Sequence, residues 1–128
     1  MRLRLALVSL AALVLAPAAQ AKMCVRISAP ETAPAGQVVA VRVTTLMPTW
    51  ANGKLVATKP ADMGGVGITV RAAGPGGEEL RLQLRRSAVK ATFVGRIAFP
   101  VRGTWTLHVQ GWEYAPRDCA KRARIIVG

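Results

Sequence analysis

The sequence contains few of the side chains on which enzyme catalysis commonly depends. Its 128 residues include a single histidine, His108, and only six carboxylates, of which Glu78 and Glu79 alone are adjacent. Nucleophilic catalysis needs a base beside its partner, and no Ser, Cys or Asp lies within a few residues of His108. Adjacent strand residues point to opposite faces, so Glu78 and Glu79 do not predict a carboxylate pair. With no phosphate-binding glycine motif either, we expect a protein that is not an enzyme and carries no cofactor.

Long apolar runs are also lacking. The longest run, at 5–16, is broken by one serine and would span about 18 Å of a hydrocarbon core roughly 30 Å thick. Two arginines precede this run and the small-residue site Ala-Gln-Ala follows it at 19–21, which is the pattern of a cleavable secretory signal peptide. We predict a signal peptide at 1–21 and one exported domain at 22–128, located in the periplasm or outside the cell.

Cysteine is scarce as well. The two cysteines, Cys24 and Cys119, belong to no CxxC motif and lie near no histidine, which disfavours a metal site or a redox thiol pair. An even number of cysteines in an exported domain favours a disulfide. We predict a Cys24–Cys119 bridge that ties the first exported segment to the last and contributes about 4–5 kcal/mol before strain. Because Cys24 shares its parity with the outward Arg26, we expect the bridge at a strand end.

Helix signals are nearly absent, and period-two alternation between Gly- and Pro-rich turns predicts strands instead. The expected strands are 24–29, 37–45, 66–73, 79–86, 88–99, 104–110 and 119–127. The side chains expected to face inward include Val39, Val41, Val43, Val66, Ile68, Val70, Ala72, Leu80, Leu82, Leu84, Phe93, Ile97, Phe99, Trp105, Leu107, Val109, Ala123, Ile125 and Val127. Seven short strands in this length predict an all-β, immunoglobulin-like two-sheet β-sandwich, with a small barrel as the alternative.

One long segment, 46–65, shows no periodicity apart from a brief strand at 55–58 after an Asn-Gly turn at 52–53. Long irregular segments are often functional. Trp50 lies in this segment, and Trp112 and Tyr114 follow the strand at 104–110. These three aromatic residues are candidate binding residues for a sugar or an extended chain. The alternative is that the two tryptophans cap the ends of the core.

Positive charge is what the chain has in excess. Lys and Arg number 18 against 6 Asp and Glu, a net charge of +12, and the predicted leader removes two arginines to leave +10. Arg81, Arg85 and Arg124 are further candidate binding residues, although the outward arginines are spread over five expected strands and form no stripe in the sequence. Nucleic-acid binding calls for basic residues interleaved with stacking aromatics, so we do not expect it. The partners expected are an anionic envelope polymer, a lipid surface or another envelope protein.

Copper is the metal that small exported β-sandwiches often handle. Soft ligands suit Cu(I), and the weak candidates here are Met47, Met63 and His108. No Met-x-Met, His-x-Met or histidine-rich run occurs, and scattered methionines more often fill gaps in a core. We therefore expect no metal site.

The stretch 91–109 consists of an apolar strand, a Pro-x-x-Gly turn at 100–103, and then Trp105 with alternating aliphatic residues. It resembles the hairpin of bacterial YtkA-like domains and related exported immunoglobulin-like domains. That resemblance implies a periplasmic or extracellular β-sandwich, sometimes associated with copper or with respiratory-enzyme assembly. The metal-ligand pattern of such an association is missing, so no binding residue follows from it. We expect an exported, non-enzymatic binding module of the cell envelope; the alternatives are a copper-handling or assembly protein and a purely structural envelope component.

Overall fold

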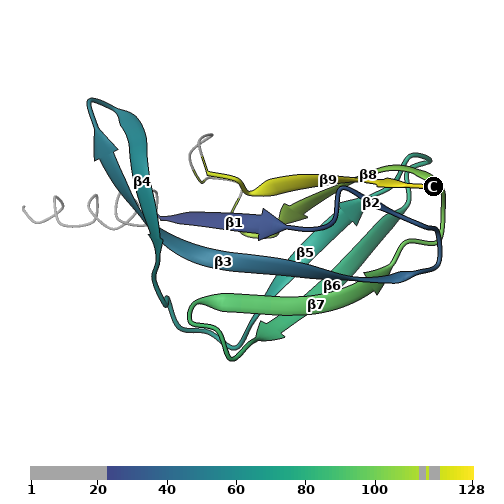
Figure 1. Ribbon diagram of the computed structural model, residues 1–128, viewed down its shortest axis with the longest axis horizontal. Coiled ribbons are helices and arrows are strands. Elements are labelled where there is room, and N and C mark those ends of the chain that lie inside the picture. Colours follow the sequence, from purple (N-terminus) through teal and green to yellow (C-terminus); the bar gives the residue numbers. More distant parts are fainter. Residues whose placement is uncertain (1–22, 113–114, 116–118) are drawn as a thin grey trace, which may run out of the picture.

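The computed structural model describes residues 23–112, 115 and 119–128, and within them every regular element is a strand (Figure 1). The predicted signal peptide and Tyr114 lie outside the described residues. The strands are β1 (Cys24–Ser28), β2 (Thr32–Ala33), β3 (Val38–Ala51), β4 (Lys54–Pro60), β5 (Gly67–Ala73), β6 (Glu79–Arg86), β7 (Thr92–Ala98), β8 (Gly103–Val109) and β9 (Arg122–Val127). The prediction of an all-β protein is therefore confirmed.

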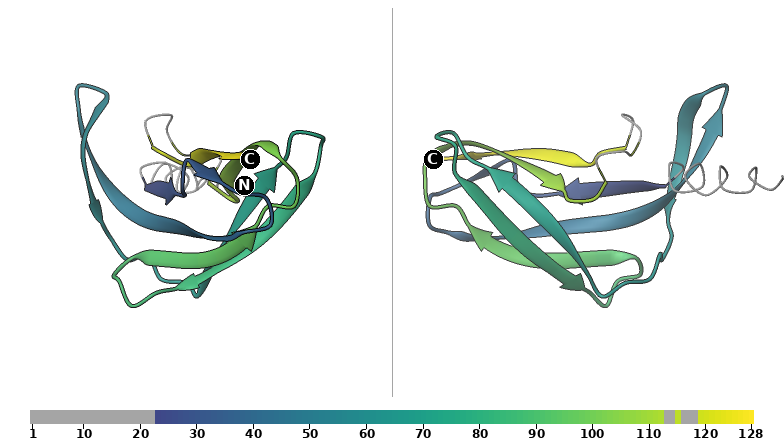
Figure 2. Two further views of the ribbon diagram at one scale, coloured as in Figure 1. Left: turned by 45° about the vertical axis from the view of Figure 1, so that its right-hand side comes forward. Right: turned by 180° about the vertical axis from the view of Figure 1, so that it is seen from behind.

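The strands form one hydrogen-bonded sheet in the order β1-β3-β7-β6-β5-β8-β9-β2, with β4 attached to β3 outside this path. Every pair is antiparallel except β2 with β9. The sheet curls strongly, as the left view of Figure 2 shows, so that its two ends approach each other. At this closure the Ile27 N–H donates a hydrogen bond of 2.9 Å to the Ala120 carbonyl. Only two residue pairs, Arg85 with Val94 and Arg86 with Phe93, join β6 to β7.

The inner face of the curl holds the core. Alternate residues of the main strands are buried there, among them Val41 and Val43 of β3 and Leu107 and Val109 of β8. The Trp105 indole is fully buried, and its Nε1–H donates a hydrogen bond of 2.8 Å to the Val101 carbonyl, which satisfies its polar atom. The expected inward residues are buried or partly buried against this core, with one exception. Val66 is 89% exposed, because β5 begins only at Gly67.

The prediction of a hairpin at 91–109 is wrong. The expected turn at 100–103 is present, but β7 pairs with β3 and β6, whereas β8 pairs with β5 and β9. The chain therefore crosses at this turn from β7 to β8, which lies three positions further along the sheet. The Phe99 and Trp105 rings, on either side of the turn, lie 5.1 Å apart between centroids and pack inside the crossing.

The prediction of a long irregular segment at 46–65 is also wrong, apart from its brief strand at 55–58, which is confirmed as part of β4 (Lys54–Pro60). β3 continues to Ala51 and returns as β4, which makes a two-stranded arm, residues 46–60, that projects from the body in Figure 1. The expected Asn52-Gly53 turn is confirmed: both residues have positive φ, 53° and 75°, as a two-residue hairpin turn of the primed type requires. The segment that remains irregular is the connection 61–66 between β4 and β5.

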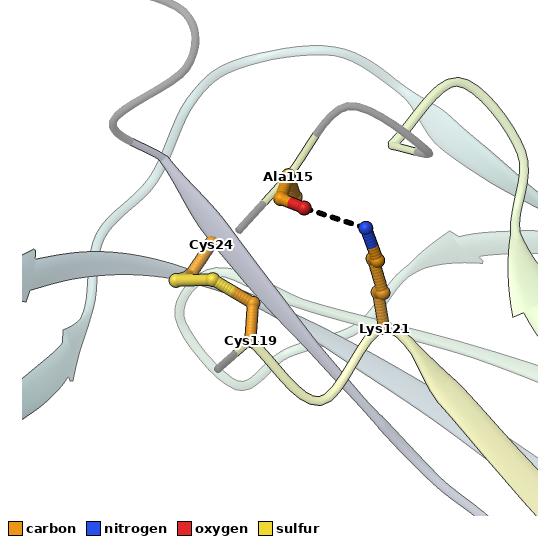
Figure 3. Close-up of a disulfide and its surroundings, with 4 residues drawn as sticks. All are labelled: Cys24, Ala115, Cys119 and Lys121. Carbon is orange, nitrogen blue, oxygen red and sulfur yellow. Dashed lines mark hydrogen bonds between the residues drawn. A yellow bond between two sulfur atoms is a disulfide. The ribbon is translucent and has the colours of Figure 1, made fainter. Parts of the chain in front are cut away.

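The predicted Cys24–Cys119 disulfide is present, with the two Cα atoms 5.4 Å apart (Figure 3). Cys24 is the first residue of β1, so the bridge lies at a strand end as expected. Both sulfur-bearing residues are buried in a small second cluster with Leu46 and Ala115. We call these four residues the disulfide cluster; Leu55 of the arm packs against it. The cluster thus fastens the arm to the first and last parts of the described fold.

Candidate functional site

Four basic side chains lie in a line across the outer face of the sheet. In the residue pairing, Arg81 of β6 is opposite Arg71 of β5, Arg71 is opposite His108 of β8, and His108 is opposite Arg122 of β9. Their chain neighbours, such as Val70, point into the core, so these side chains face outward. We call Arg81, Arg71, His108 and Arg122 the basic row. Its three interstrand steps span about 14 Å.

Like charges opposite each other in a sheet repel, and Glu79 offsets this at one end of the row. The Glu79 Oε1 atom lies 2.9 Å from Nη2 of Arg71 and 3.9 Å from Nε of Arg81. The Arg71 Nε atom is buried and has no hydrogen-bond partner within the described part of the chain. One carboxylate therefore serves two guanidiniums here, and it compensates only one of the two positive charges.

The other end of the row has no such compensation. Arg122 and Arg124 are both exposed on β9, and neither forms an ion pair or a side-chain hydrogen bond with any residue that the structure describes. Arg124 lies opposite Thr106 of β8. This pair is two residues along the strands from the pair of His108 and Arg122, and its side chains point to the same face. The positive charge at this end is therefore left for solvent ions or for a partner.

The expected site residues fall into separate regions. Arg81 belongs to the basic row, and Arg124 lies beside it on the same face. Arg85 also faces outward from β6, four residues and about 13 Å along the strand from Arg81. Three members of the row, Arg71, His108 and Arg122, were not among the expected binding residues, because only strand pairing brings them together.

The tryptophans lie elsewhere. Trp50 is half-buried on the arm and pairs in register with Leu55, which packs against the disulfide cluster. Trp112 packs against both that cluster and the main core, as a residue that caps the end of the core would do. Neither indole is part of the basic row. Trp50 on the arm and Trp112 at the disulfide cluster are thus separate from the charged candidates, which lie on β6 and β9.

The weak copper candidates lie in three separate parts of the fold. Met47 is on the arm, and Met63 is exposed in the connection after β4. His108 has guanidinium-bearing neighbours on both sides, Arg71 and Arg122, and such surroundings disfavour a bound cation. Among the described residues, no group of three or more His, Cys, Asp or Glu side chains is placed to hold a metal ion.

One arginine outside the row is fully engaged. The Arg86 guanidinium donates to Oδ2 of Asp62 at 2.8 Å and to the Gly65 carbonyl at 2.8 and 3.1 Å, and it stacks 5.0 Å from the centre of the Phe93 ring. The Gly64 N–H also donates to the Asp62 carboxylate. This hydrogen bond, followed by the one from Arg86, lowers the pKa of Asp62. Arg86 therefore fastens the connection 61–66 to the sheet.

Comparison with protein-family models found no match to this chain, and comparison with curated protein sequences found none either. No helix among the described residues has the length and apolar character needed to cross a membrane. What the chain does must therefore be inferred from its own surface, where the basic row aligns three arginines and one histidine across four neighbouring strands.

Proposed function

We propose that this protein is an exported, non-enzymatic binding module of the cell envelope that holds anionic partners on its basic row. The observation that carries the proposal is the register that aligns Arg81, Arg71, His108 and Arg122 across four neighbouring strands. Neighbouring positions in such a row are about 5 Å apart, which is shorter than the screening length of ~8 Å at physiological salt. The fields of its three arginines therefore reinforce one another, and a partner meets a strip of positive potential.

An extended anionic polymer of the envelope fits this strip better than a compact partner. The row is about 14 Å long and only one residue wide, so a chain lying across the strands can contact all four side chains at once. Arginine suits this use because its guanidinium stays charged and donates in pairs to carboxylate or phosphate oxygens. A lipid surface or another envelope protein is the competing partner.

The fold that supports this surface is proposed to be an immunoglobulin-like sandwich. Two groups of strands, β1-β3-β7 and β6-β5-β8-β9, are joined through only two residue pairs and enclose one core. Seven strands divided into groups of three and four are typical of that architecture. The first part of the chain is also divided between the two groups: β1 pairs with β3, and β2 pairs with β9. The basic row lies wholly on the outer face of the four-stranded group.

Export is supported by the Cys24–Cys119 disulfide, since such bonds persist mainly in oxidising compartments. A stapled, rigid sheet with few catalytic side chains suits a role in binding. Most enzymes convert their substrates in an enclosed site from which water is excluded. The outer face of a sheet offers a ligand no such enclosure.

The test measures binding of an anionic polymer and of a neutral polymer over a range of salt concentrations. The domain 22–128 is expected to bind an anionic wall polymer, but not a neutral one, at about 50 mM salt, and to lose most of this binding by about 500 mM. Equilibrium binding by fluorescence anisotropy of labelled polymer measures both. Binding that does not change with salt, or the absence of binding at low salt, would overturn the proposal.

A further inference from the structure

The uncompensated end of the basic row contains a shallow hollow. It has a volume of about 260 Å³ and is lined by Thr106 of β8 and by Arg122, Ala123 and Arg124 of β9. Arg122 and Arg124 are alternate residues of one strand, so their side chains stand on the same outward face about 7 Å apart. The Ala123 side chain points the other way and packs against the core, which leaves the space between the two arginines open.

Three donor side chains line this hollow, those of Thr106, Arg122 and Arg124. His108 is directly opposite Arg122, and Thr106 is directly opposite Arg124, with about 5 Å between the facing positions. Two guanidiniums and a hydroxyl thus line a space whose facing strand positions are about 5 by 7 Å apart. Each of these groups can donate a hydrogen bond, and neither guanidinium can accept one.

No carboxylate competes for the two guanidiniums within the described residues. Glu79 is three strands away in the same cross-strand line as Arg124 and is bound to Arg71. Glu31 lies beside β9, where its carbonyl accepts a hydrogen bond from the Ile126 N–H, but its carboxylate forms no ion pair with a described residue. The hollow therefore combines high positive charge, several donors and open access, which together favour a small, multiply charged oxyanion.

We infer that the hollow between Arg122 and Arg124 binds a phosphate group, carried by a phosphate-diester polymer of the envelope. This inference rests on the proposed function and names its ligand chemistry. Phosphate is favoured over carboxylate because a tetrahedral group offers oxygens in several directions, which suits the three donor side chains around the hollow, whereas a carboxylate offers two oxygens in one plane. From a phosphate held in the hollow, the polymer continues over Arg71 and Arg81, about 10 to 14 Å away along the row.

Two pairs of variants test the site at equal net charge. R122Q/R124Q removes both guanidiniums of the hollow, and R42Q/R96Q removes two exposed, outward arginines of β3 and β7 on the three-stranded group. We expect the first pair to weaken binding of poly(glycerol phosphate) by about tenfold or more and the second by less than about twofold. Equal losses from both pairs would overturn the phosphate site but leave a diffuse basic binding surface. If the unmodified domain bound no anionic polymer at low salt, both this inference and the proposed function would be wrong.

A third variant tests the site without changing charge. Thr106→Val keeps the shape of the side chain but removes the hydroxyl, and we expect it to weaken binding of the same polymer about fivefold. NMR titration with inorganic phosphate should shift the amide signals of Thr106, Arg122 and Arg124, and acetate at equal ionic strength should not. Unchanged affinity of the Thr106→Val variant together with equal shifts from acetate would overturn the assignment to phosphate.

The source of the phosphate is decided by comparing two probes. Poly(glycerol phosphate) in solution and vesicles containing phosphatidylglycerol present the same phosphate-diester chemistry as a polymer and as a lipid headgroup. We expect R122Q/R124Q to lose affinity for the polymer. A loss seen with vesicles alone would overturn the polymer as occupant and assign the hollow to a headgroup. Thermal unfolding of each variant, compared with the unmodified domain, shows that the fold is retained.

Discussion

Arginine has opposite roles at two regions of this molecule. Where the connection 61–66 meets the sheet, Arg86 satisfies Asp62 and Gly65 and stacks on Phe93, so its charge is used up inside the fold. On the outer face of β9, Arg122 and Arg124 have no partner among the described residues. Side chains of the same type thus serve stability in one region and remain available to a ligand in the other. Net charge alone does not separate these roles, whereas hydrogen-bond partners do.

The largest effect should come from the disulfide, which fastens the arm and both ends of the described fold. Replacing both cysteines, Cys24→Ala with Cys119→Ala, should lower the free energy of unfolding by about 2–5 kcal/mol, because the unfolded chain loses its cross-link. Urea unfolding of both proteins under non-reducing conditions measures the difference. A loss below about 1 kcal/mol would mean that the strands around the bridge hold this region without it.

The variants Arg86→Met and Arg122→Met test whether one arginine serves stability and the other serves binding. The first should cost about 1–2 kcal/mol of unfolding free energy, since it removes hydrogen bonds to Asp62 and Gly65 and the contact with the Phe93 ring. The second should change stability by less than about 0.5 kcal/mol, because Arg122 is exposed and makes no such contacts.

Binding of an anionic polymer should show the reverse order for the same two variants, with the larger loss for Arg122→Met. Chemical denaturation and polymer titration on the same preparations supply both measurements. If both variants lost stability and affinity in parallel, the division of roles would be wrong.

The turn at the end of the arm should give a smaller effect. Gly53 has φ of 75°, and no atom lies within 4 Å of an added Cβ, so Gly53→Ala tests backbone conformation alone. We expect a loss of about 1 kcal/mol. Asn52→Gly is the control and should be close to neutral, since glycine adopts the φ of 53° freely. An unchanged midpoint for Gly53→Ala would show that the arm unfolds separately from the body.

The smallest effect concerns pH. Because the Gly64 N–H and the Arg86 guanidinium lower the pKa of Asp62 below 3.8, ionised Asp62 contributes stability above that pH. This contribution is lost as the pH falls through the lowered pKa of the folded state. Asp62→Asn should therefore be less stable than the unmodified domain at pH 7, and the gap should close at the acid end. Thermal unfolding from pH 7 down to about pH 2 follows it, and a gap that stays constant would contradict the assignment.

Period-two alternation predicted the seven main strands because each has one buried face. Most of the arm escaped prediction because it lacks such a face: nearly all of β4 is exposed on both sides, and β3 contains Pro48, a residue that is rare within strands. Val66 was placed in the core because it continues the alternation of β5, although the strand starts one residue later.

The candidate site was less predictable, because it depends on which strands pair. The opposition of Arg71 and Arg81 follows from a hairpin with a short turn at 74–78, and could have been derived from the sequence. The opposition of His108 and Arg122 depends on the connection 110–121, and a connection of that length does not set the register of the strands. The pairing of β5 with β8 joins strands far apart in the chain, and no local pattern predicts it.

The disulfide has a consequence for cleavage by proteases. Every peptide bond between Cys24 and Cys119 lies in one covalent ring, which includes the exposed turn at 52–53. A single cut within that ring opens it but releases no fragment, and the paired strands on either side of the cut still hold their register. Two separate cuts within the ring are needed before any piece of the ring can leave. In a compartment with proteases and few reductants, a molecule nicked at the arm would keep its basic row assembled.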